Sequence, residues 1–303
     1  MSEANRPSDE AIETLALATA VKATVIAARR ILEIWPNPAN PAWDRRLVNA
    51  VYAKAAGIGN YATWADEESE RIILAEIRAQ TSFAEHDIVS EEAGTAGTVS
   101  AWQWVIDPID GTASFRNGAP EFGVSIGLLK DGVPVVGVIA LPAFDQLIAA
   151  RRGQGARLHA LDGRLLADLN ERSDSEATLD RALVGFDIGY ERRTEQLTRL
   201  LPRVAEKVGA LISYFSPTTA SFRVATGALG AYFYAFPTIF DIAAAAAIVL
   251  EIGGVVTDLE GQPIDWSAPR RSYVAASRPA THQRLLELIN DQNLDTRSWK
   301  DAT

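Results

Sequence analysis

A short apolar segment that runs directly into two aspartates constrains this chain more than any other feature. Residues 104–106 are apolar and partly β-branched, which predicts a buried strand. Proline cannot donate a hydrogen bond to a sheet, so we expect Pro108 to end the strand, with Asp107 at its carboxyl end and Asp110 in the following turn. Open α/β sheets place their ligand sites at such strand ends. The segment therefore predicts an α/β fold with an acidic site at one edge of a sheet.

The residues that follow the two aspartates strengthen this interpretation. Gly111 lets a backbone approach a ligand closely, and Thr112 offers both a hydroxyl and an N–H group. Two carboxylates beside backbone donors are what a divalent cation and a phosphate need together. An ordinary turn capped by aspartates contains the same residue types, so this pattern alone leaves both readings open.

The rest of the chain alternates helical and strand patterns, which is typical of α/β proteins. Helical patterns occupy residues 11–35, 44–56, 66–80, 191–208, 218–226, 239–252 and 282–290. Strand patterns occupy residues 86–89, 122–129, 133–140, 147–150, 182–186, 211–215, 231–234, 255–256 and 273–275. Residues 153–156 are glycine-rich but lack the lysine and helix of a nucleotide-binding loop. The polar residues 171–178 are the best boundary between two halves, 1–175 and 176–303.

Composition excludes several classes of function. The 303 residues include no cysteine, so a disulfide framework, a thiolate zinc site and a cysteine nucleophile are impossible. The net charge of −10 argues against nucleic-acid binding, although bound metal ions can reverse the local sign for a phosphate. The N-terminal residues lack the basic segment followed by an apolar segment that is typical of a signal peptide. We also find no apolar run of the roughly 20 residues that a membrane helix needs. We therefore expect a cytoplasmic protein that binds neither nucleic acid nor membranes.

Three motifs in a fixed order resemble the inositol monophosphatase family, the Mg²⁺-dependent, lithium-sensitive phosphatases. They are Ser90-Glu91-Glu92, the segment Trp104-Val105-Ile106-Asp107-Pro108-Ile109-Asp110-Gly111-Thr112, and Phe240-Asp241-Ile242-Ala243-Ala244. The resemblance extends from about Lys54 to Ala276. It implies an α-β-α-β-α sandwich of the inositol monophosphatase and fructose-1,6-bisphosphatase type, a hydrolase for a small phosphorylated metabolite, and a homodimer.

The resemblance also implies a metal site with two or three Mg²⁺ ions. A two-metal phosphatase needs a carboxylate that bridges ions ~3.5–4 Å apart, and Asp107 on a rigid strand end is the best candidate. The first ion would be held by Glu91, Asp107 and the Ile109 carbonyl, and the second by Asp107, Asp110 and Asp241. Glu91 would also reach a loosely bound third ion. The first half would then carry most metal ligands, and the second would complete the site with Asp241, although an aspartate at a helix start is more often an N-cap.

The remaining implied roles concern water and phosphate. Thr112 would orient the attacking water, Asp66 would accept its proton, and Glu91 completes the catalytic set. Residues implied to bind the substrate are Asp110, Gly111, Thr112, Ala113 and Asp241. Lys54 resembles a family lysine that lies upstream of Asp66.

The part of the pattern that selects the substrate is altered. Tyr234 stands where inositol-specific members have a glutamate, Gly230 stands where they have an aspartate, and residues 215–219 lack their Gly-Ser-Ala. Aromatic residues there would instead stack on a flat or apolar substrate. Alternative substrates are 3′-phosphoadenosine 5′-phosphate, fructose 1,6-bisphosphate and histidinol phosphate. A metal-binding regulatory relative without turnover, or a purely structural acidic protein, is the non-enzyme alternative.

Overall fold

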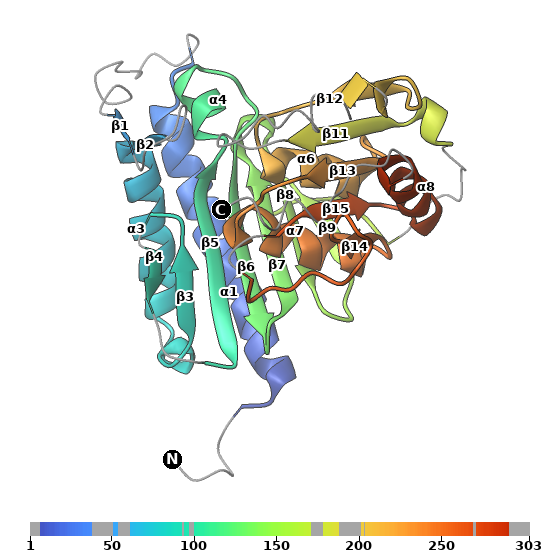
Figure 1. Cartoon of the computed structure of the whole chain (residues 1–303). Coiled ribbons are helices and arrows are strands. Elements are labelled where there is room, and N and C mark those ends of the chain that lie inside the picture. Colours follow the sequence, from blue (N-terminus) through green and yellow to red (C-terminus); the bar gives the residue numbers. More distant parts are fainter. Residues whose placement is uncertain are drawn as a thin grey trace.

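Helix layers and sheet layers alternate through the molecule (Figure 1). The computed structural model describes residues 7–37, 51–53, 61–92, 94–96, 100–170, 178–187, 201–202, 204–268 and 271–290. Within them the helices are α1 (Asp9–Ile34), α3 (Trp64–Arg78), α4 (Thr112–Arg116), α6 (Pro217–Thr226), α7 (Ile239–Glu251) and α8 (Pro279–Asn290). Short 3₁₀ turns are η2 (Thr81–Phe83), η3 (Pro142–Phe144) and η4 (Leu179–Arg181).

The larger sheet has the order β10-β9-β8-β7-β6-β5-β3-β4. Its strands are β3 (Asp87–Ser90), β4 (Gly94–Ala96), β5 (Trp102–Asp110), β6 (Gly123–Lys130), β7 (Val133–Leu141), β8 (Gln146–Arg151), β9 (Ala156–His159) and β10 (Leu165–Asp168). Its neighbours pair antiparallel except β3 and β5, which are parallel. The carboxyl ends of β3 and β5 therefore meet at the same edge, as the motif pattern predicts.

The smaller sheet has the order β12-β11-β13-β15-β14. Its strands are β11 (Leu183–Asp187), β12 (Ala210–Ile212), β13 (Ala231–Tyr234), β14 (Val255–Thr257) and β15 (Tyr273–Ala276). Helices α1 and α3 cover one face of the larger sheet, α6 and α7 lie between the two sheets, and α8 covers the far face of the smaller one (Figure 1). This arrangement confirms the predicted α-β-α-β-α sandwich.

Two local predictions were wrong, and some strands were not predicted. Pro108 does not end its strand, because β5 continues to Asp110. The pairing of β5 with β6 shifts register between Asp107 and Asp110, so the proline lies where no ladder hydrogen bond is required. Residues 51–53, predicted as helix, form β1 (Val51–Ala53), which pairs with β2 (Tyr61–Thr63). Strands β4 and β10 were not predicted. Lys54, residues 44–50, most of 191–208 and the boundary at 171–177 lie outside the described residues.

The expectation about membrane-length segments also needs correction. Helix α1, with 26 residues, is long and apolar enough to cross a membrane by length and composition. In the structure it packs against α3, β6, β7 and β8 and buries residues such as Ala20, Ala27 and Ile31. A core helix of a globular protein passes the same test.

Two glycines allow α7 to lie unusually close to the larger sheet. A Cβ atom at Gly127 of β6 would come within 3.0 Å of the Ala244 backbone nitrogen. A Cβ atom at Gly137 of β7 would come within 2.3 Å of the Ala244 carbonyl oxygen and 3.0 Å of the Ala247 Cβ atom. The alanine-rich sequence of α7 supplies the complementary small surface. The glycines and alanines together set the distance between the sheet and the helix that carries Asp241.

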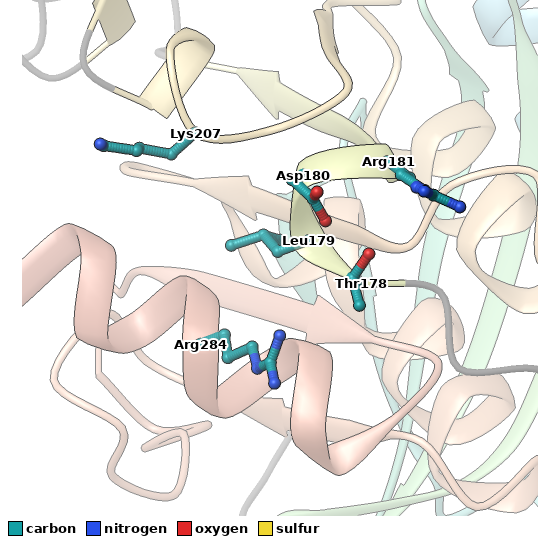
Figure 2. A pocket seen from close by; sticks show the side chains of 6 residues that line it. All are labelled: Thr178, Leu179, Asp180, Arg181, Lys207 and Arg284. Atoms are coloured by element: carbon teal, nitrogen blue, oxygen red, sulfur yellow. The ribbon is translucent and has the colours of Figure 1, made fainter.

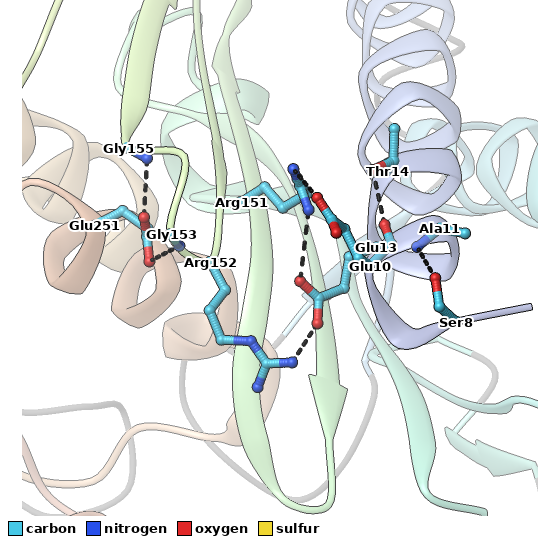
Figure 3. Close-up of polar contacts among 10 residues, drawn as sticks. All are labelled: Ser8, Glu10, Ala11, Glu13, Thr14, Arg151, Arg152, Gly153, Gly155 and Glu251. Carbon is cyan, nitrogen blue, oxygen red and sulfur yellow. Dashed lines mark hydrogen bonds and ion pairs between the residues drawn. The ribbon is translucent and has the colours of Figure 1, made fainter.

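The glycine-rich turn after β8 is held from within the molecule (Figure 3). Glu251, the last residue of α7, accepts hydrogen bonds from the N–H groups of Gly153 (3.0 Å) and Gly155 (2.9 Å). Arg152 in the same turn pairs with Glu13, a buried carboxylate of α1. The Glu251 carboxylate therefore binds the backbone N–H groups that a nucleotide loop would offer to a phosphate. The turn also connects α1 and α7, which lie on opposite faces of the larger sheet.

Candidate active site and metal centre

Three aspartates from two different layers meet at the edge where β5 ends. Carboxylate oxygens of Asp107, Asp110 and Asp241 all lie within 4.8 Å of one another. Asp107 and Asp110 belong to β5 and are buried, with 2% and 5% of their surface exposed, whereas Asp241 belongs to the first turn of α7 and is half-buried. The structure thus brings together three of the four predicted metal-binding carboxylates.

Asp110 is fixed by the beginning of α6. The Ser216 hydroxyl and the Thr218 backbone N–H donate to its Oδ2 atom, at 2.6 and 2.7 Å. Ser216 is the N-cap of α6 and accepts a hydrogen bond from the Thr219 N–H at 3.1 Å. The positive end of the helix dipole therefore faces a carboxylate. This contact joins the first half of the chain to the second.

Asp241 takes part in the capping of α7 and also lies in the acidic cluster. Thr238, not Asp241, is the N-cap of α7, and Asp241 is the third helical residue of a capping box. The Thr238 N–H and hydroxyl donate to Asp241 Oδ2 at 2.5 and 2.8 Å. The capping contacts orient the side chain, and its carboxylate still lies in the acidic cluster.

Crowding and burial raise the proton affinity of this cluster. Burial raises the pKa of Asp110 to about 7, against the opposing hydrogen bonds from Ser216 and Thr218, and the charge of Glu91 adds to the rise. Burial also raises the pKa of Asp241 to about 8, with further contributions from the charges of Asp110 and Glu91. A bound divalent cation would remove this mutual repulsion.

Glu91 lies beside the three aspartates but outside the group that they form. Its backbone N–H donates to the Ile106 carbonyl at 3.2 Å, which continues the pairing of β3 with β5 beyond Ser90. Its charge acts on both Asp110 and Asp241. Its role as a ligand of the first and third ions stays a prediction.

The residues predicted to activate water lie next to the cluster. The Thr112 hydroxyl is 3.1 Å from Asp66 Oδ1 and 3.0 Å from the Ile109 carbonyl oxygen, so its single proton is shared between two acceptors. Asp66 is fully buried in the first turn of α3. Gly111 adopts a left-handed φ of +79°, and a Cβ atom there would lie 2.6 Å from the Glu121 carbonyl oxygen. Only glycine fits this turn, which places Thr112 and Ala113 at the start of α4.

One face of α3 contacts all the segments that carry the first-half site residues. Asp66 bonds Thr112 as described above. The Ser69 hydroxyl donates to the Pro108 carbonyl at 2.8 Å, and Glu70 accepts a hydrogen bond from the Ser90 hydroxyl. Positions i, i+3 and i+4 of a helix share a face. Ser69 and Glu70 were not among the predicted site residues, although their spacing from Asp66 was a usable signal.

Tyr234, which was expected to line the substrate site, is part of the core together with Tyr232. Tyr232 is fully buried, and its hydroxyl donates to the buried carboxylate of Asp187 at 2.9 Å. Tyr234, only 8% exposed, packs beside Tyr232. The exposed aromatic residue in this part of the structure is Phe215, with 59% of its surface accessible. It directly precedes Ser216, the partner of Asp110.

A cavity of 690 Å³ lies elsewhere, where η4 faces α8 (Figure 2). Its lining residues are Thr178, Leu179, Asp180, Arg181, Lys207 and Arg284. The Lys207 and Arg181 side chains point to opposite sides of this cavity in Figure 2, and all three basic residues are exposed. The cations therefore do not converge on a ligand, and none of the site carboxylates lines this cavity.

The donor set of the acidic cluster fits Mg²⁺. Its side chains offer carboxylate oxygens, the hard ligands that Mg²⁺ and Ca²⁺ prefer, and no imidazole or thiolate that would favour a softer metal. Clustered carboxylates beside a positioned hydroxyl and the start of a short helix are suited to hydrolysis of a phosphate ester with metal assistance.

Comparisons with known proteins agree with this geometry. Residues 15–294 match the model of the inositol monophosphatase family. A probable inositol 1-monophosphatase, ImpA of Mycobacterium tuberculosis, is 34% identical over 76% of this chain and 82% of its own length. Nus factor SuhB of Pasteurella multocida is also 34% identical, over the same shares. The crystal structure of suhB from Bartonella henselae, 25% identical, superposes with a TM-score of 0.77 over 92% of this chain and 99% of its own. The chain belongs to the inositol monophosphatase family.

Proposed function

We propose that the protein is a Mg²⁺-dependent phosphomonoesterase that hydrolyses a small phosphorylated metabolite. The observation that carries the proposal is the meeting of Asp107, Asp110 and Asp241 within 4.8 Å, next to the Thr112–Asp66 pair. Membership of the family supports phosphatase activity, and the cluster of acidic residues supports dependence on a metal.

The chain's own residues would act as follows. The ions would be held by Glu91, Asp107, Asp110, Asp241 and the Ile109 carbonyl. Bound Mg²⁺ would supply charge neutralisation for the phosphate and lower the pKa of the attacking water.

The Thr112 hydroxyl orients the water in line with the phosphorus–oxygen ester bond, and Asp66 receives its proton through that hydroxyl. The phosphorus–oxygen ester bond breaks as the water oxygen bonds to phosphorus, and the leaving alkoxide takes a proton from solvent water. Asp66 then returns its proton to solvent, so the products are an alcohol and inorganic phosphate. The N–H groups of Gly111, Thr112 and Ala113 hold the phosphate oxygens at the start of α4.

The substrate differs from inositol 1-phosphate in this proposal. No carboxylate stands at position 234 or 230, where inositol-specific members have them, and Tyr234 is buried. The test is a Mg²⁺-dependent assay against inositol phosphates, sugar phosphates, 3′-phosphoadenosine 5′-phosphate and histidinol phosphate. We expect phosphate release that EDTA abolishes. We also expect the kcat/KM for inositol 1-phosphate to be lower than the highest kcat/KM in the panel. Absence of hydrolysis with every ester would contradict the proposal.

We also propose that the protein is a cytoplasmic homodimer. Size-exclusion chromatography with light scattering tests the dimer.

A regulatory role is the second candidate, because a relative named Nus factor SuhB is as similar to this chain as the named phosphatase. Calorimetry with Mg²⁺ separates the two. Mg²⁺ binding together with turnover supports the enzyme, whereas binding without turnover of any ester supports the regulatory role.

A further inference from the structure

Phe215 adopts a backbone conformation that its residue type disfavours. Three non-glycine residues in the described part of the chain have a positive φ: Asp131, Asp145 and Phe215. Aspartate tolerates the left-handed region because its short polar side chain bonds locally. Phenylalanine has no such compensation, so its φ of +51° is strained. Glycine would satisfy the backbone here at a lower cost, and folding alone therefore does not explain this side chain.

The ring of Phe215 is also exposed. With 59% of its surface accessible, it is the most exposed of the large hydrophobic residues in the described ranges. An aromatic side chain gains nothing from the core when it faces solvent. A strained backbone that presents an exposed aromatic ring is typical of a recognition site.

Ser213 and Ser216, which lie on either side of Phe215 in the sequence, are both anchored by hydrogen bonds to buried carboxylates. The Ser213 hydroxyl donates to Asp187 at 2.6 Å, and Asp187 is itself buried and accepts a second hydrogen bond from Tyr232. The Ser216 hydroxyl donates to Asp110 at 2.6 Å. Residues 213–216, which we call the anchored loop, thus join a buried carboxylate of the smaller sheet to the acidic cluster.

The anchored loop places Phe215 within reach of a bound ester. Adjacent Cα atoms are about 3.8 Å apart, so the Phe215 Cα atom lies within about 9 Å of Asp110 Oδ2 along the path through Ser216. A phosphomonoester held by the acidic cluster projects its organic group over a similar distance. The Phe215 Cα atom therefore lies within the distance that the organic group of a bound ester spans.

We propose that Phe215 contacts the organic part of the substrate and selects phosphomonoesters with an aromatic or otherwise flat apolar group. This inference rests on the proposed phosphatase activity and specifies its substrate class. Aromatic pairs add a modest free energy to area burial, which corresponds to about a 3- to 10-fold preference.

The experiment compares benzyl phosphate with propyl phosphate, two esters of primary alcohols that differ in the aromatic ring. The measured quantity is the ratio of their kcat/KM values in wild type, Phe215→Gly, Phe215→Tyr and Phe215→Leu. We expect the wild type and Phe215→Tyr to prefer benzyl phosphate, and Phe215→Gly and Phe215→Leu to lose about 3- to 10-fold of this preference. The glycine variant also relieves the strained φ, so its Tm should equal or exceed that of the wild type.

The control is Leu165→Ala, which removes another exposed apolar side chain, on β10, and should keep the wild-type ratio. An unchanged ratio in Phe215→Gly would overturn this inference and leave the phosphatase proposal standing. Failure of the wild type to hydrolyse any ester would overturn both.

Discussion

Substitution of Gly137 by alanine tests whether the spacing between α7 and the larger sheet sets the metal site. The new Cβ atom would lie 2.3 Å from the Ala244 carbonyl oxygen and 3.0 Å from the Ala247 Cβ atom. A carbon–oxygen contact is normally about 3.3 Å or longer, so α7 must move away by about 1 Å. The nearest atom belongs to the backbone, and no side-chain rotation can relieve this contact.

Two effects of Gly137→Ala should appear together. Overpacking of a core typically costs about 1–3 kcal/mol, which lowers Tm by about 2–10 °C in a chain of this size. Asp241 lies in the first turn of α7 and moves with the helix, whereas Asp107 stays on β5. Mg²⁺ tolerates ligand displacements of only about 0.2 Å, so we expect its affinity to fall by about 10-fold or more.

Thermal unfolding in EDTA and calorimetric titration with Mg²⁺ measure the two effects separately. Gly127→Ala should lower Tm and Mg²⁺ affinity less than Gly137→Ala does, because the nearest atom to its added Cβ lies at 3.0 Å. Gly132→Ala is the control for destabilisation away from α7: its positive φ strains an alanine, but no atom lies within 4 Å of the added Cβ, so its Mg²⁺ affinity should equal that of the wild type. Wild-type Mg²⁺ affinity in a folded but destabilised Gly137→Ala protein would refute the link between helix spacing and the site.

Further predictions concern the carboxylates and the hydroxyl of the site. EDTA should abolish hydrolysis and Mg²⁺ should restore it, and Asp107→Asn should lower kcat more than any other single ligand change because the proposed bridge loses its charge. Thr112→Ala should lower kcat by ~10²–10⁴-fold with Mg²⁺ affinity nearly intact, and combination with Asp66→Asn should add little if the two act as a unit. In EDTA, the free energy of unfolding should fall as pH rises from about 4 to 8, because Asp110 and Asp241 have pKa values of about 7 and about 8 in the folded protein and near 4 when unfolded. Urea titrations at pH 5 and pH 8 measure this loss, which saturating Mg²⁺ should reverse.

The parts of the site that the sequence predicted are those encoded by local patterns. An apolar segment followed by Asp107 indicates a strand end, and an aspartate before an alanine-rich segment indicates a helix start. Because β3 and β5 are parallel neighbours, their carboxyl ends lie at the same edge of the larger sheet. Asp107 and Asp110 both lie on β5, and their convergence with Asp241 follows from the position of α7 between the sheets.

The features that were missed depend on contacts between distant segments. Gly127 and Gly137 look like ordinary strand glycines until α7 is placed against them. Pro108 stays within β5 because the register shifts at that point, and a register shift leaves no local signal. Tyr234 was placed in the substrate site by alignment of motifs alone, yet its burial in β13 assigns it to the core.

The structure separates the residues proposed for hydrolysis from those proposed for selection. Thr112 and Asp66 are held by α3 and α4, within the first half of the chain. Phe215 is held by the anchored loop, whose position depends on Asp187 in the smaller sheet. The anchored loop meets the acidic cluster through the hydrogen bond from the Ser216 hydroxyl to Asp110. A change at position 215 therefore alters the surface presented to the organic group without displacing the water-activating pair.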